Sequence, residues 1–363
     1  MITSVQLSNF RSYKEETVYL SKNINVFIGK NGQGKTNLLE AIYYISNIRS
    51  HRTRNDNDLI KVDSEYSRII VNIEKNSNNE KLMCVIHQKG KYFSINNNVV
   101  SKTSDMLGRI NTVLFYPNET RIFSDSPATR RNFFDVEIGK VSKDYLNIFQ
   151  QFNKLLKDRN KILKEKDVDL ILLEIVTNNL IDKQLSIIKE REHLTQFINN
   201  NFSKYFFKFT DNKFKVKMVY KSSLKDLSKD EIKSKYEKNI DRDKFNGITT
   251  EGIHRDDYEF LVENIEISKY LSQGQLRLVL LAIKFVIIDY IIHKTNQKPI
   301  LLLDDVFSEL DSIHQQKVLD NIPKNIQTII TTTDNYEIFH NKSISKYKIN
   351  NSNIFKKEDF DAE

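Results

Sequence analysis

A glycine-rich turn that ends in a lysine and a threonine is the first stretch of this chain whose residues could do chemistry. The run from Gly29 to Thr36 fits the pattern G-x-x-x-x-G-K-[ST] of a phosphate-binding loop. Glycines permit backbone angles that a Cβ would forbid, so successive N–H groups can turn toward one anion. Lys35 is expected to reach the β- and γ-phosphates of a nucleotide, and the Thr36 hydroxyl to hold Mg²⁺. The predicted nucleotide contacts are Gly29, Lys30, Asn31, Gly32, Gln33, Gly34, Lys35 and Thr36.

The residues on either side of this turn supply the strand and the helix that such a loop needs. The apolar run Ile24–Ile28 is typical of a buried strand, and a helix is expected from Lys35 to about Asn47. The positive end of that helix adds to the attraction for phosphate. A chance glycine turn would explain the glycines but not these flanking elements, so the sequence predicts a nucleotide site.

Two carboxylates follow a second apolar run, Ile300–Leu303. Such a run fits a central parallel strand that is buried on both faces. Asp304 at its end can hold Mg²⁺ directly or through water. Asp305 could orient or deprotonate the attacking water. A plain Asp-Asp turn is the alternative; beside a phosphate loop, the pattern favours nucleotide hydrolysis with Lys35, Asp304 and Asp305 as the catalytic candidates.

A third motif, residues 271–275, precedes a long apolar helix that is expected over Leu276–Ile292. Ser272 is a good N-cap residue, and Gly274 keeps the turn open to an anion. Taken alone, this is an ordinary capped helix. Its place about 30 residues before the strand that ends in Asp304 makes it a candidate for a nucleotide contact.

Length and composition set the broad class of the protein. A chain of 363 residues is long for one compact core, so an insertion or a second domain is expected. The single cysteine, Cys84, excludes an intramolecular disulfide and suits a reducing compartment. The most apolar helix contains Arg277, Lys284 and Asp289, so it is predicted to be a buried globular helix and no membrane partner is expected.

The remaining pattern places strands at both sides of the phosphate loop and helices in the middle of the chain. Alternating runs predict strands within residues 1–28 and an antiparallel β section over 68–100. Helical spacing over 141–201 predicts two long helices with a turn near 166–169. The Asn- and Lys-rich tail after about Asn341 is expected to be loosely ordered.

Basic residues are concentrated in the middle of the chain. The net charge is +8, and residues 140–244 hold 24 basic and 16 acidic side chains, an excess of eight. A lysine-rich face can serve solubility alone or can bind the phosphates of nucleic acid. The candidates for contact with DNA are Arg130, Arg131, Lys213, Lys215 and Lys217.

In chain order, the motifs at residues 29–36, 271–275 and 300–305 resemble the phosphate loop, signature and Walker B strand of an ABC-type ATPase head. Ser308 and Asp311 then occupy a stretch that resembles its D-loop. More specific stretches resemble the RecF family of bacterial DNA replication and repair proteins. These stretches are residues 7–13, 37–43, 50–52, 130–135, 252–257 and 271–275.

The resemblance implies an α/β fold: an ABC-type ATPase head with a P-loop core and an antiparallel β section, carrying an inserted, mainly helical lid. The head would comprise residues 1–135 and 245–363, and the basic lid residues 136–244. The cofactors implied are ATP, contacted also by Arg11, and Mg²⁺, held by Thr36 and Asp304. The signature residues that would act on the ATP of a partner subunit are Ser272, Gln273, Gly274 and Gln275.

The same resemblance implies a cytoplasmic, nucleoid-associated protein that dimerises with ATP and hydrolyses it slowly. Double-stranded and gapped DNA would be its substrates, and RecR with RecO would be its partners in loading RecA. One departure from many ABC heads concerns Asp305, which replaces a catalytic glutamate and has a shorter reach. Another is Thr333, which occupies the region of a switch histidine and cannot act as a cationic sensor.

Two other function classes use the same head. The ATPase subunit of a membrane transporter would need a coupling surface for membrane partners, and the stretches that resemble the RecF family argue against it. An SMC-like structural head would need coiled-coil arms of hundreds of residues, whereas the insertion expected here holds only about a hundred. Binding of duplex DNA with and without ATP would separate a DNA-binding ATPase of the RecF type from a transporter subunit.

Overall fold

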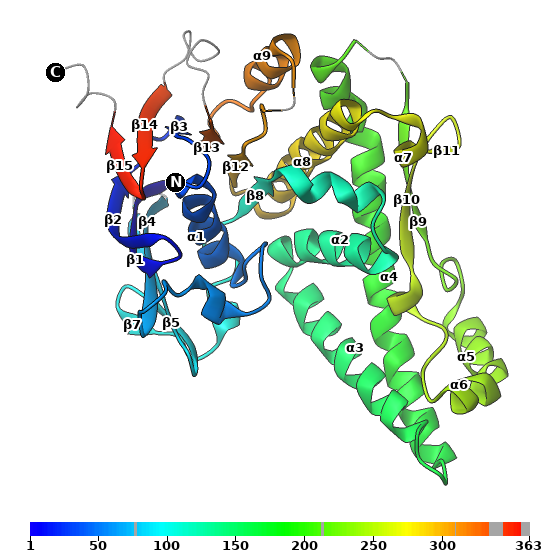
Figure 1. Cartoon of the computed structure of the whole chain (residues 1–363). Coiled ribbons are helices and arrows are strands. Elements are labelled where there is room, and N and C mark those ends of the chain that lie inside the picture. Colours follow the sequence, from blue (N-terminus) through cyan, green and yellow to red (C-terminus); the bar gives the residue numbers. More distant parts are fainter. Residues whose placement is uncertain (76–77, 212–213, 309, 334–343, 357–363) are drawn as a thin grey trace, which may run out of the picture. The chain divides into compact units, whose positions relative to one another are not determined.

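The chain forms two compact units, each of which is built from segments that lie apart in the sequence (Figure 1). The computed structural model describes residues 1–75, 78–211, 214–308, 310–333 and 344–356. The first unit comprises residues 1–119, 208–211 and 291–363, and the second comprises 120–207 and 212–290. The expected lid, 136–244, lies in the second unit apart from residues 208–211, and that unit also takes in 120–135 and 245–290. The domain boundaries at 135 and 244 therefore stay a prediction.

The first unit contains a six-stranded antiparallel sheet with the strand order β2-β1-β4-β5-β6-β7. This confirms the β section that the alternating pattern predicts before residue 100. The alternation also sets which side of the sheet is buried, because successive side chains of a strand point to opposite faces. The strands are β1 (Ile2–Phe10), β2 (Tyr13–Tyr19), β4 (Tyr66–Lys75), β5 (Asn78–His87), β6 (Gly90–Ile95) and β7 (Asn98–Val99).

A second six-stranded sheet carries the ends of the nucleotide motifs, with the order β15-β14-β3-β13-β12-β8. All neighbours in it are parallel except the β14–β15 pair. The strand β12 (Ile300–Asp304) lies between β8 and β13 and is buried at all five residues, as its continuous apolar run predicts. The others are β3 (Ile24–Ile28), β8 (Thr112–Phe115), β13 (Thr328–Thr332), β14 (Ile344–Asn350) and β15 (Asn353–Lys356).

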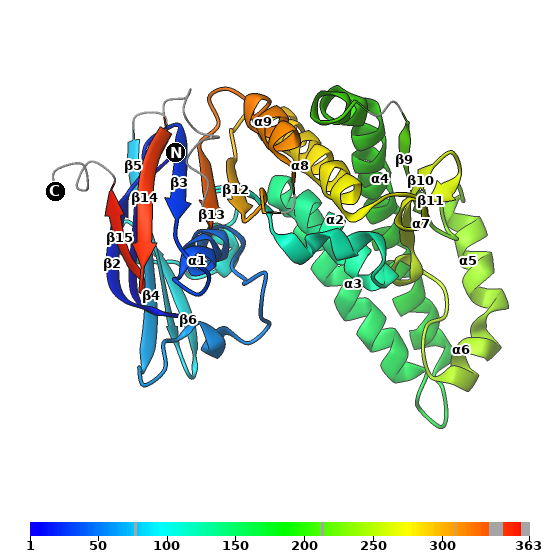
Figure 2. The same cartoon turned by 45° about the horizontal axis from the view of Figure 1, so that its top comes forward.

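The helix α1 (Lys35–Asn47) is packed between these two sheets, as Figures 1 and 2 show. Ten of its 13 residues are buried, including charged Lys35 and Glu40. Its apolar side chains share one hydrophobic core with residues of both sheets, such as Val71 of β4 and Leu302 of β12. A helix that is covered on both sides cannot shift without opening that core, so the loop at its start has a rigid support.

The expectation of a loosely ordered tail is wrong for residues 344–356, which form β14 and β15. The strand β14 pairs in parallel with β3, the strand that leads into the phosphate loop. Tyr347 is buried and its ring stacks on Phe27 of β3, with ring centroids 4.6 Å apart. Lysines and asparagines on the exposed side of β14 mask an alternation of apolar residues that only pairing with a distant strand reveals.

The second unit is mainly helical and holds a three-stranded antiparallel sheet with the order β11-β10-β9. The two long helices, α3 (Lys143–Ile162) and α4 (Leu170–Phe209), confirm the prediction of a turn near 166–169. Met218 and Tyr220 of β9 are buried, whereas Lys217 and Lys221 are exposed. The remaining elements are α2 (Pro127–Val141), β9 (Val216–Lys221), α5 (Lys229–Lys238), α6 (Ile240–Asn246), β10 (Asp257–Val262), β11 (Ile265–Glu266), α7 (Ile267–Tyr270) and most of α8 (Gln273–Thr295).

A buried arginine joins two of the stretches that resemble the RecF family within this unit. The Arg191 guanidinium of α4 is 1% exposed; its Nε and one Nη bond Asp135 of α2 at 2.9 and 2.8 Å. Its other Nη lies 3.0 Å from a carboxylate oxygen of Asp256, next to β10. A buried charge is tolerated only when it is paired and hydrogen-bonded, so this contact holds α2, α4 and β10 in one arrangement.

Candidate functional site

The phosphate loop has the backbone that its glycines predict. Gly32 and Gly34 adopt φ angles of 79° and 107°, which lie in the left-handed region that favours glycine. The loop leaves β3 and enters α1, for which Gly34 is the N-cap residue. The Gly34 carbonyl accepts the N–H of Leu38 at 3.1 Å and so begins the hydrogen bonding of the helix.

Gly29 is required for a different reason, which the sequence does not reveal. Its φ lies outside the left-handed region, but a Cβ on it would overlap the carbonyl oxygen of Ile349 on β14. A Cβ on Gly34 would lie 3.1 Å from both the Ser352 and Tyr13 hydroxyl oxygens. Two glycines of the loop are therefore packed against other parts of the first unit.

Lys35 lies across the loop that it follows. Its ammonium donates hydrogen bonds to the carbonyl oxygens of Gly29 and, at 2.9 Å, of Lys30. The residue is only 7% exposed, so its charge is directed inward at the loop and away from bulk water. A cation in this position strengthens the attraction of the loop for a phosphate.

The structure brings together the two predicted metal ligands, although 268 positions separate them in the sequence. The Thr36 hydroxyl donates to the Asp304 carboxylate at 3.1 Å, and the Thr331 hydroxyl of β13 donates to the same oxygen at 2.6 Å. Burial raises the pKa of Asp304, although these two hydrogen bonds oppose that shift. A hydroxyl and a carboxylate oxygen side by side are suitable ligands for Mg²⁺.

A magnesium ion here would take its further ligands from phosphate oxygens and water, as is usual for this ion. Within the described ranges, no group of three or more His, Cys, Asp and Glu side chains could hold a metal. Thr36 and Asp304 stay the predicted ligands of the ion, which when bound would withdraw charge from the phosphates.

Asp305 follows β12 in a left-handed conformation, with a φ angle of 46°. Its N–H donates to the backbone carbonyl and the hydroxyl of Thr331, at 3.1 and 3.2 Å. Its own carbonyl accepts the Ser308 hydroxyl at 3.0 Å, and Asp311 caps the helix α9 (Ser312–Asp320). The two expected D-loop residues thus hold the turn after Asp305 in shape, and their action on a nucleotide stays a prediction.

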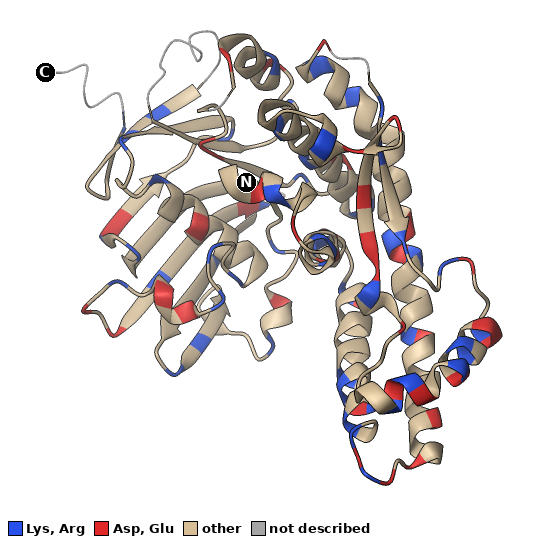
Figure 3. Ribbon diagram, turned by 45° about the vertical axis from the view of Figure 1, so that its right-hand side comes forward, with Lys and Arg blue, Asp and Glu red and all other residues tan. Residues whose placement is uncertain are grey.

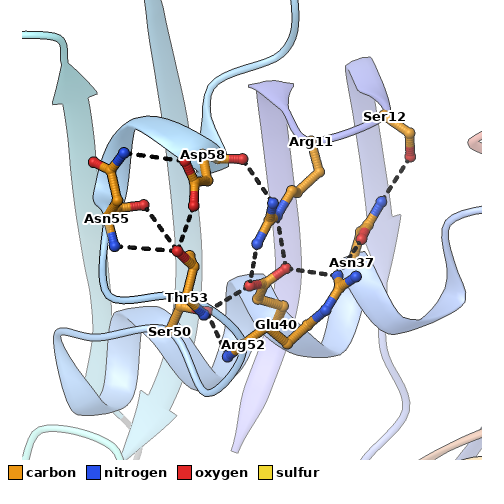
Figure 4. Close-up of polar contacts among 9 residues, drawn as sticks. All are labelled: Arg11, Ser12, Asn37, Glu40, Ser50, Arg52, Thr53, Asn55 and Asp58. Atoms are coloured by element: carbon orange, nitrogen blue, oxygen red, sulfur yellow. Dashed lines mark hydrogen bonds and ion pairs between the residues drawn. The ribbon is translucent and has the colours of Figure 1, made fainter.

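Arg11, expected to contact ATP, is held by Glu40 of α1 (Figure 4). Its Nε and one Nη donate to the two oxygens of Glu40 at 2.9 and 2.8 Å, and the other Nη donates to the carbonyl of Asp58 at 2.7 Å. Glu40 also accepts the Ser50 hydroxyl at 2.5 Å and an Nη of Arg52 at 3.0 Å. These bonds use three of the five N–H donors of the guanidinium, and contact between Arg11 and ATP stays a prediction.

Sequence reasoning missed Glu40, although a signal was present. The side chain is fully buried, and it lies among Leu38, Leu39, Ala41 and Ile42 on a helix with little exposed surface. A carboxylate in such surroundings needs charged or hydrogen-bonding partners. Burial alone would raise the pKa of Glu40, but the hydrogen bonds and charges of the two arginines and Ser50 outweigh it, so the pKa is lowered.

The signature motif forms a capped helix start in the second unit. The Ser272 hydroxyl accepts the N–H of Gln275 at 3.3 Å, and the Gln275 side chain accepts the N–H of Ser272 at 2.9 Å. Ser272 and Gln273 are exposed, and a Cβ on Gly274 would meet nothing within 4 Å. The action of these residues on the ATP of a partner subunit stays a prediction.

The five candidates for contact with DNA differ in their hydrogen bonds and in their exposure to solvent. Arg130 is paired with Asp257 through bonds of 2.7 and 2.8 Å, and an Nη of Arg131 donates to the Asp256 carbonyl at 2.6 Å. Lys213 falls outside the described residues. Lys215 and Lys217 are exposed at the start of β9. In Figure 3, acidic and basic residues are interspersed along the helices of this unit.

Comparison with known proteins connects these motifs with one family. The family described as "RecF/RecN/SMC N terminal domain" matches residues 1–358. The "DNA replication and repair protein RecF" of Staphylococcus aureus strain JH9 is 35% identical over 370 residues, which cover 98% of this chain and all of that protein. The same protein of strain Newman matches equally. The chain belongs to the RecF family.

Solved structures give the same result for the fold. The recombination mediator protein RecF with ATPrS or with ATP is 29% identical, with a TM-score of 0.89 in both cases. The alignment covers 98% of this chain and 98% or 97% of those chains. An Smc head bound to the winged-helix domain of ScpA has a TM-score of 0.58 at 17% identity over 98% and 97% of the two chains. The expected fold, an ABC-type ATPase head, is confirmed. Within the described ranges, the structure has no helix that is long and apolar enough to cross a membrane.

We predict that Glu40→Gln lowers the free energy of unfolding by about 2–3 kcal/mol at pH 7, because charge-assisted hydrogen bonds to two arginines are lost. The folded-state pKa of Glu40 is lowered, so its stabilisation is present above the unfolded pKa and disappears as pH falls through the folded one. The difference in the free energy of unfolding between wild type and Glu40→Gln should therefore shrink below about pH 4. Urea unfolding at several pH values measures this.

Glu65→Gln is the control for this prediction, because Glu65 is an exposed carboxylate of the same unit. It should change stability little at any pH. A deficit for Glu40→Gln that stays constant from pH 7 to pH 3 would show that ionised Glu40 does not stabilise the fold.

Proposed function

We propose that the chain is an ATP-dependent DNA-binding protein of recombinational repair and replication restart, and a slow ATPase. The observation that carries the proposal is the meeting of Thr36 and Asp304 beside a phosphate loop, in a chain that matches RecF proteins over nearly its full length. The relatives are named DNA replication and repair proteins, and one solved relative carries ATP.

In this proposal, the N–H groups of the loop and the Lys35 ammonium hold the β- and γ-phosphates of ATP. Thr36 and Asp304 hold Mg²⁺, which neutralises charge on the phosphates during hydrolysis. Asp305 orients or deprotonates the attacking water. Support for the last role is its place directly after Asp304; its side chain is shorter than the glutamate of many ABC heads, which fits a slow rather than a fast reaction.

Replacement of the two central charged residues tests this arrangement. Asp304→Asn keeps the shape of the side chain but weakens Mg²⁺ attraction, so kcat should fall on the order of 100-fold, or about 2.7 kcal/mol of transition-state stabilisation, with little loss of ATP binding. Lys35→Ala should weaken binding itself. Steady-state ATPase assays and ATP titrations separate the two effects. Asp320→Asn, at an exposed position, is the control, and an unchanged rate for Asp304→Asn would exclude the metal assignment.

A second part of the proposal is that ATP makes the protein a dimer in which Ser272 to Gln275 of one subunit face the ATP of the other. The support is the exposed and capped start of α8, with open space around Gly274. Helix N-termini attract anions. A two-fold dimer would place two such termini against two nucleotides, each touched by both subunits. The γ-phosphate then makes contacts that ADP lacks, so ATP stabilises the dimer and ADP does not.

Ser272→Arg is expected to abolish the ATP-induced dimer while the variant still binds ATP as a monomer, because a bulky side chain would lie in the interface. Sedimentation velocity with ATP, Mg²⁺ or ADP measures this. Ser228→Arg is a matched control: Ser228 is exposed and caps α5 with Glu231 in the same way, so both variants lose one N-cap, about 1 kcal/mol. A dimer of undiminished strength in Ser272→Arg would refute the role of Ser272.

The DNA part of the proposal rests on the names of the relatives and on the basic excess in the middle of the chain. We propose double-stranded and gapped DNA as the substrate, RecR with RecO as partners in RecA loading, and action in the cytoplasm at the nucleoid. One solved relative is described as a member of the RecFOR pathway, which supports these partners. Lys215 and Lys217 are the exposed candidates for phosphate contact, with Lys213 nearby in sequence.

Contact through these lysines predicts sequence-independent binding that weakens as salt rises, since each neutralised phosphate releases counterions. Replacing Lys213, Lys215 and Lys217 with Gln should reduce the slope of log K against log salt by up to about 2.7. Fluorescence anisotropy with duplex, gapped and single-stranded DNA measures it. The control replaces Lys14, Lys22 and Lys89, three exposed lysines of the first unit. An equal slope for both triple variants would exclude the predicted surface.

A further inference from the structure

Three consecutive residues at the β1–β2 turn, Arg11–Tyr13, contact the phosphate loop or the helix that follows it. Arg11 binds Glu40 of α1, and the Ser12 hydroxyl accepts the amide of Asn37 at 2.9 Å (Figure 4). The Tyr13 hydroxyl donates to the carbonyl of Gly34 at 3.0 Å. Tyr13 is fully buried, so this hydrogen bond is shielded from water. One short turn is thus attached to the start of α1 at three points.

A second turn, β14–β15 at Asn350–Asn353, contacts the loop from the segment that was expected to be loosely ordered. The N–H of Asn351 donates to the side-chain oxygen of Gln33 at 2.5 Å, and the N–H of Ser352 donates to the Gln33 carbonyl at 3.0 Å. The Ser352 hydroxyl lies 2.7 Å from that of Ser12 and joins the two turns.

We propose that these two turns are positioning elements of the nucleotide site, which hold the phosphate loop in its anion-binding conformation before a nucleotide arrives. Ser12, Tyr13 and Ser352 are the positioning residues. The inference rests on the proposed binding of ATP at this loop. It assigns a role to the stretch around Arg11 beyond direct contact with the nucleotide, and a role to the C-terminal hairpin.

The physical reason is the entropy of a glycine-rich loop. Glycine loses more backbone freedom on ordering than any other residue, and the loop from Gly29 to Gly34 contains three. If ATP alone had to order the loop, that loss would weaken binding. Hydrogen bonds to Gln33 and Gly34, and the close approach of Ile349 to Gly29, order the loop within the folded protein. The nucleotide then meets donors that already point at it.

Thermodynamic linkage gives a consequence that contacts with only a structural role would not show. If the two turns favour the binding conformation of the loop, a nucleotide that binds the loop must stabilise the two turns by the same free energy. The amides of Asn351 and Ser352 should therefore exchange more slowly with solvent when ATP is bound. Hydrogen exchange in a peptide that covers residues 344–356 reports on both amides.

The experiment combines ATP titration with hydrogen exchange on the full chain. Tyr13→Phe removes one hydroxyl and keeps the buried ring, and Ser12→Ala removes the hydroxyl that joins the two turns. Tyr13→Phe loses one hydrogen bond and Ser12→Ala loses two. The Kd and KM for ATP should rise by about three- to tenfold in the first variant and at least as much in the second, with kcat nearly unchanged. In wild type, ATP with Mg²⁺ should slow exchange in residues 344–356.

Matched controls separate positioning from general stability. Tyr236→Phe removes a buried hydroxyl that donates to the Glu251 carbonyl at the same distance, 3.0 Å, in the second unit. Ser8→Ala removes a hydroxyl of β1 that accepts an Nη of Arg68. Both controls should bind ATP as wild type does. Thermal unfolding of all four variants identifies any loss of stability, and the exchange measurement on wild type does not depend on the folding of a variant.

Two outcomes overturn the inference. One is an ATP affinity in Tyr13→Phe and Ser12→Ala equal to that of the controls, and the other is exchange in residues 344–356 that ATP leaves unchanged. Failure of the underlying function has a different signature: wild type would not bind ATP, or Lys35→Ala would bind it as well as wild type does.

Discussion

The burial of a charged helix is the constraint on which the first unit depends. The helix α1 begins with Lys35, carries Glu40 in its middle and is covered on both sides by a sheet. A buried carboxylate without partners would disfavour the fold by several kcal/mol, so donors must come from elsewhere in the chain. Arg11, Ser50 and Arg52 supply them from two segments that flank the helix in sequence. The partners of one side chain thus place the turn before the loop and the segment after the helix.

The same helix places the chemistry. Because α1 contacts the mixed sheet, Thr36 at its start lies beside the end of β12, where Asp304 is located. Thr331 of the neighbouring strand orients the same carboxylate. Parallel strands end at one edge of a sheet, and ligands of α/β proteins are bound at that edge. Residues far apart in sequence therefore converge because the strands are parallel and adjacent.

Sequence reasoning was reliable where the signal is local. The phosphate loop, the strand before it, the capped start of α8 and the buried run of β12 each occupy a short stretch whose spacing determines its structure. It was unreliable where a residue depends on a distant partner. The β14 strand needs β3 beside it, Gly29 needs the Ile349 carbonyl, and the lowered pKa of Glu40 needs Arg11 and Arg52. None of these partners can be inferred from spacing.

Charged residues in two of the stretches that resemble the RecF family are paired within the fold. Arg130 of one such motif is paired with Asp257 of another, and Asp135 and Asp256, one from each motif, both bind Arg191 of α4. Charges that are engaged in this way gain little from a phosphate, because binding it would break a pair that is already formed. Lys217, by contrast, stands exposed on a strand whose alternate residues Met218 and Tyr220 are buried, so its charge is directed at solvent. A basic residue within a family motif can therefore serve the fold, and the exposed lysines outside the motifs stay the candidates for contact with a polyanion.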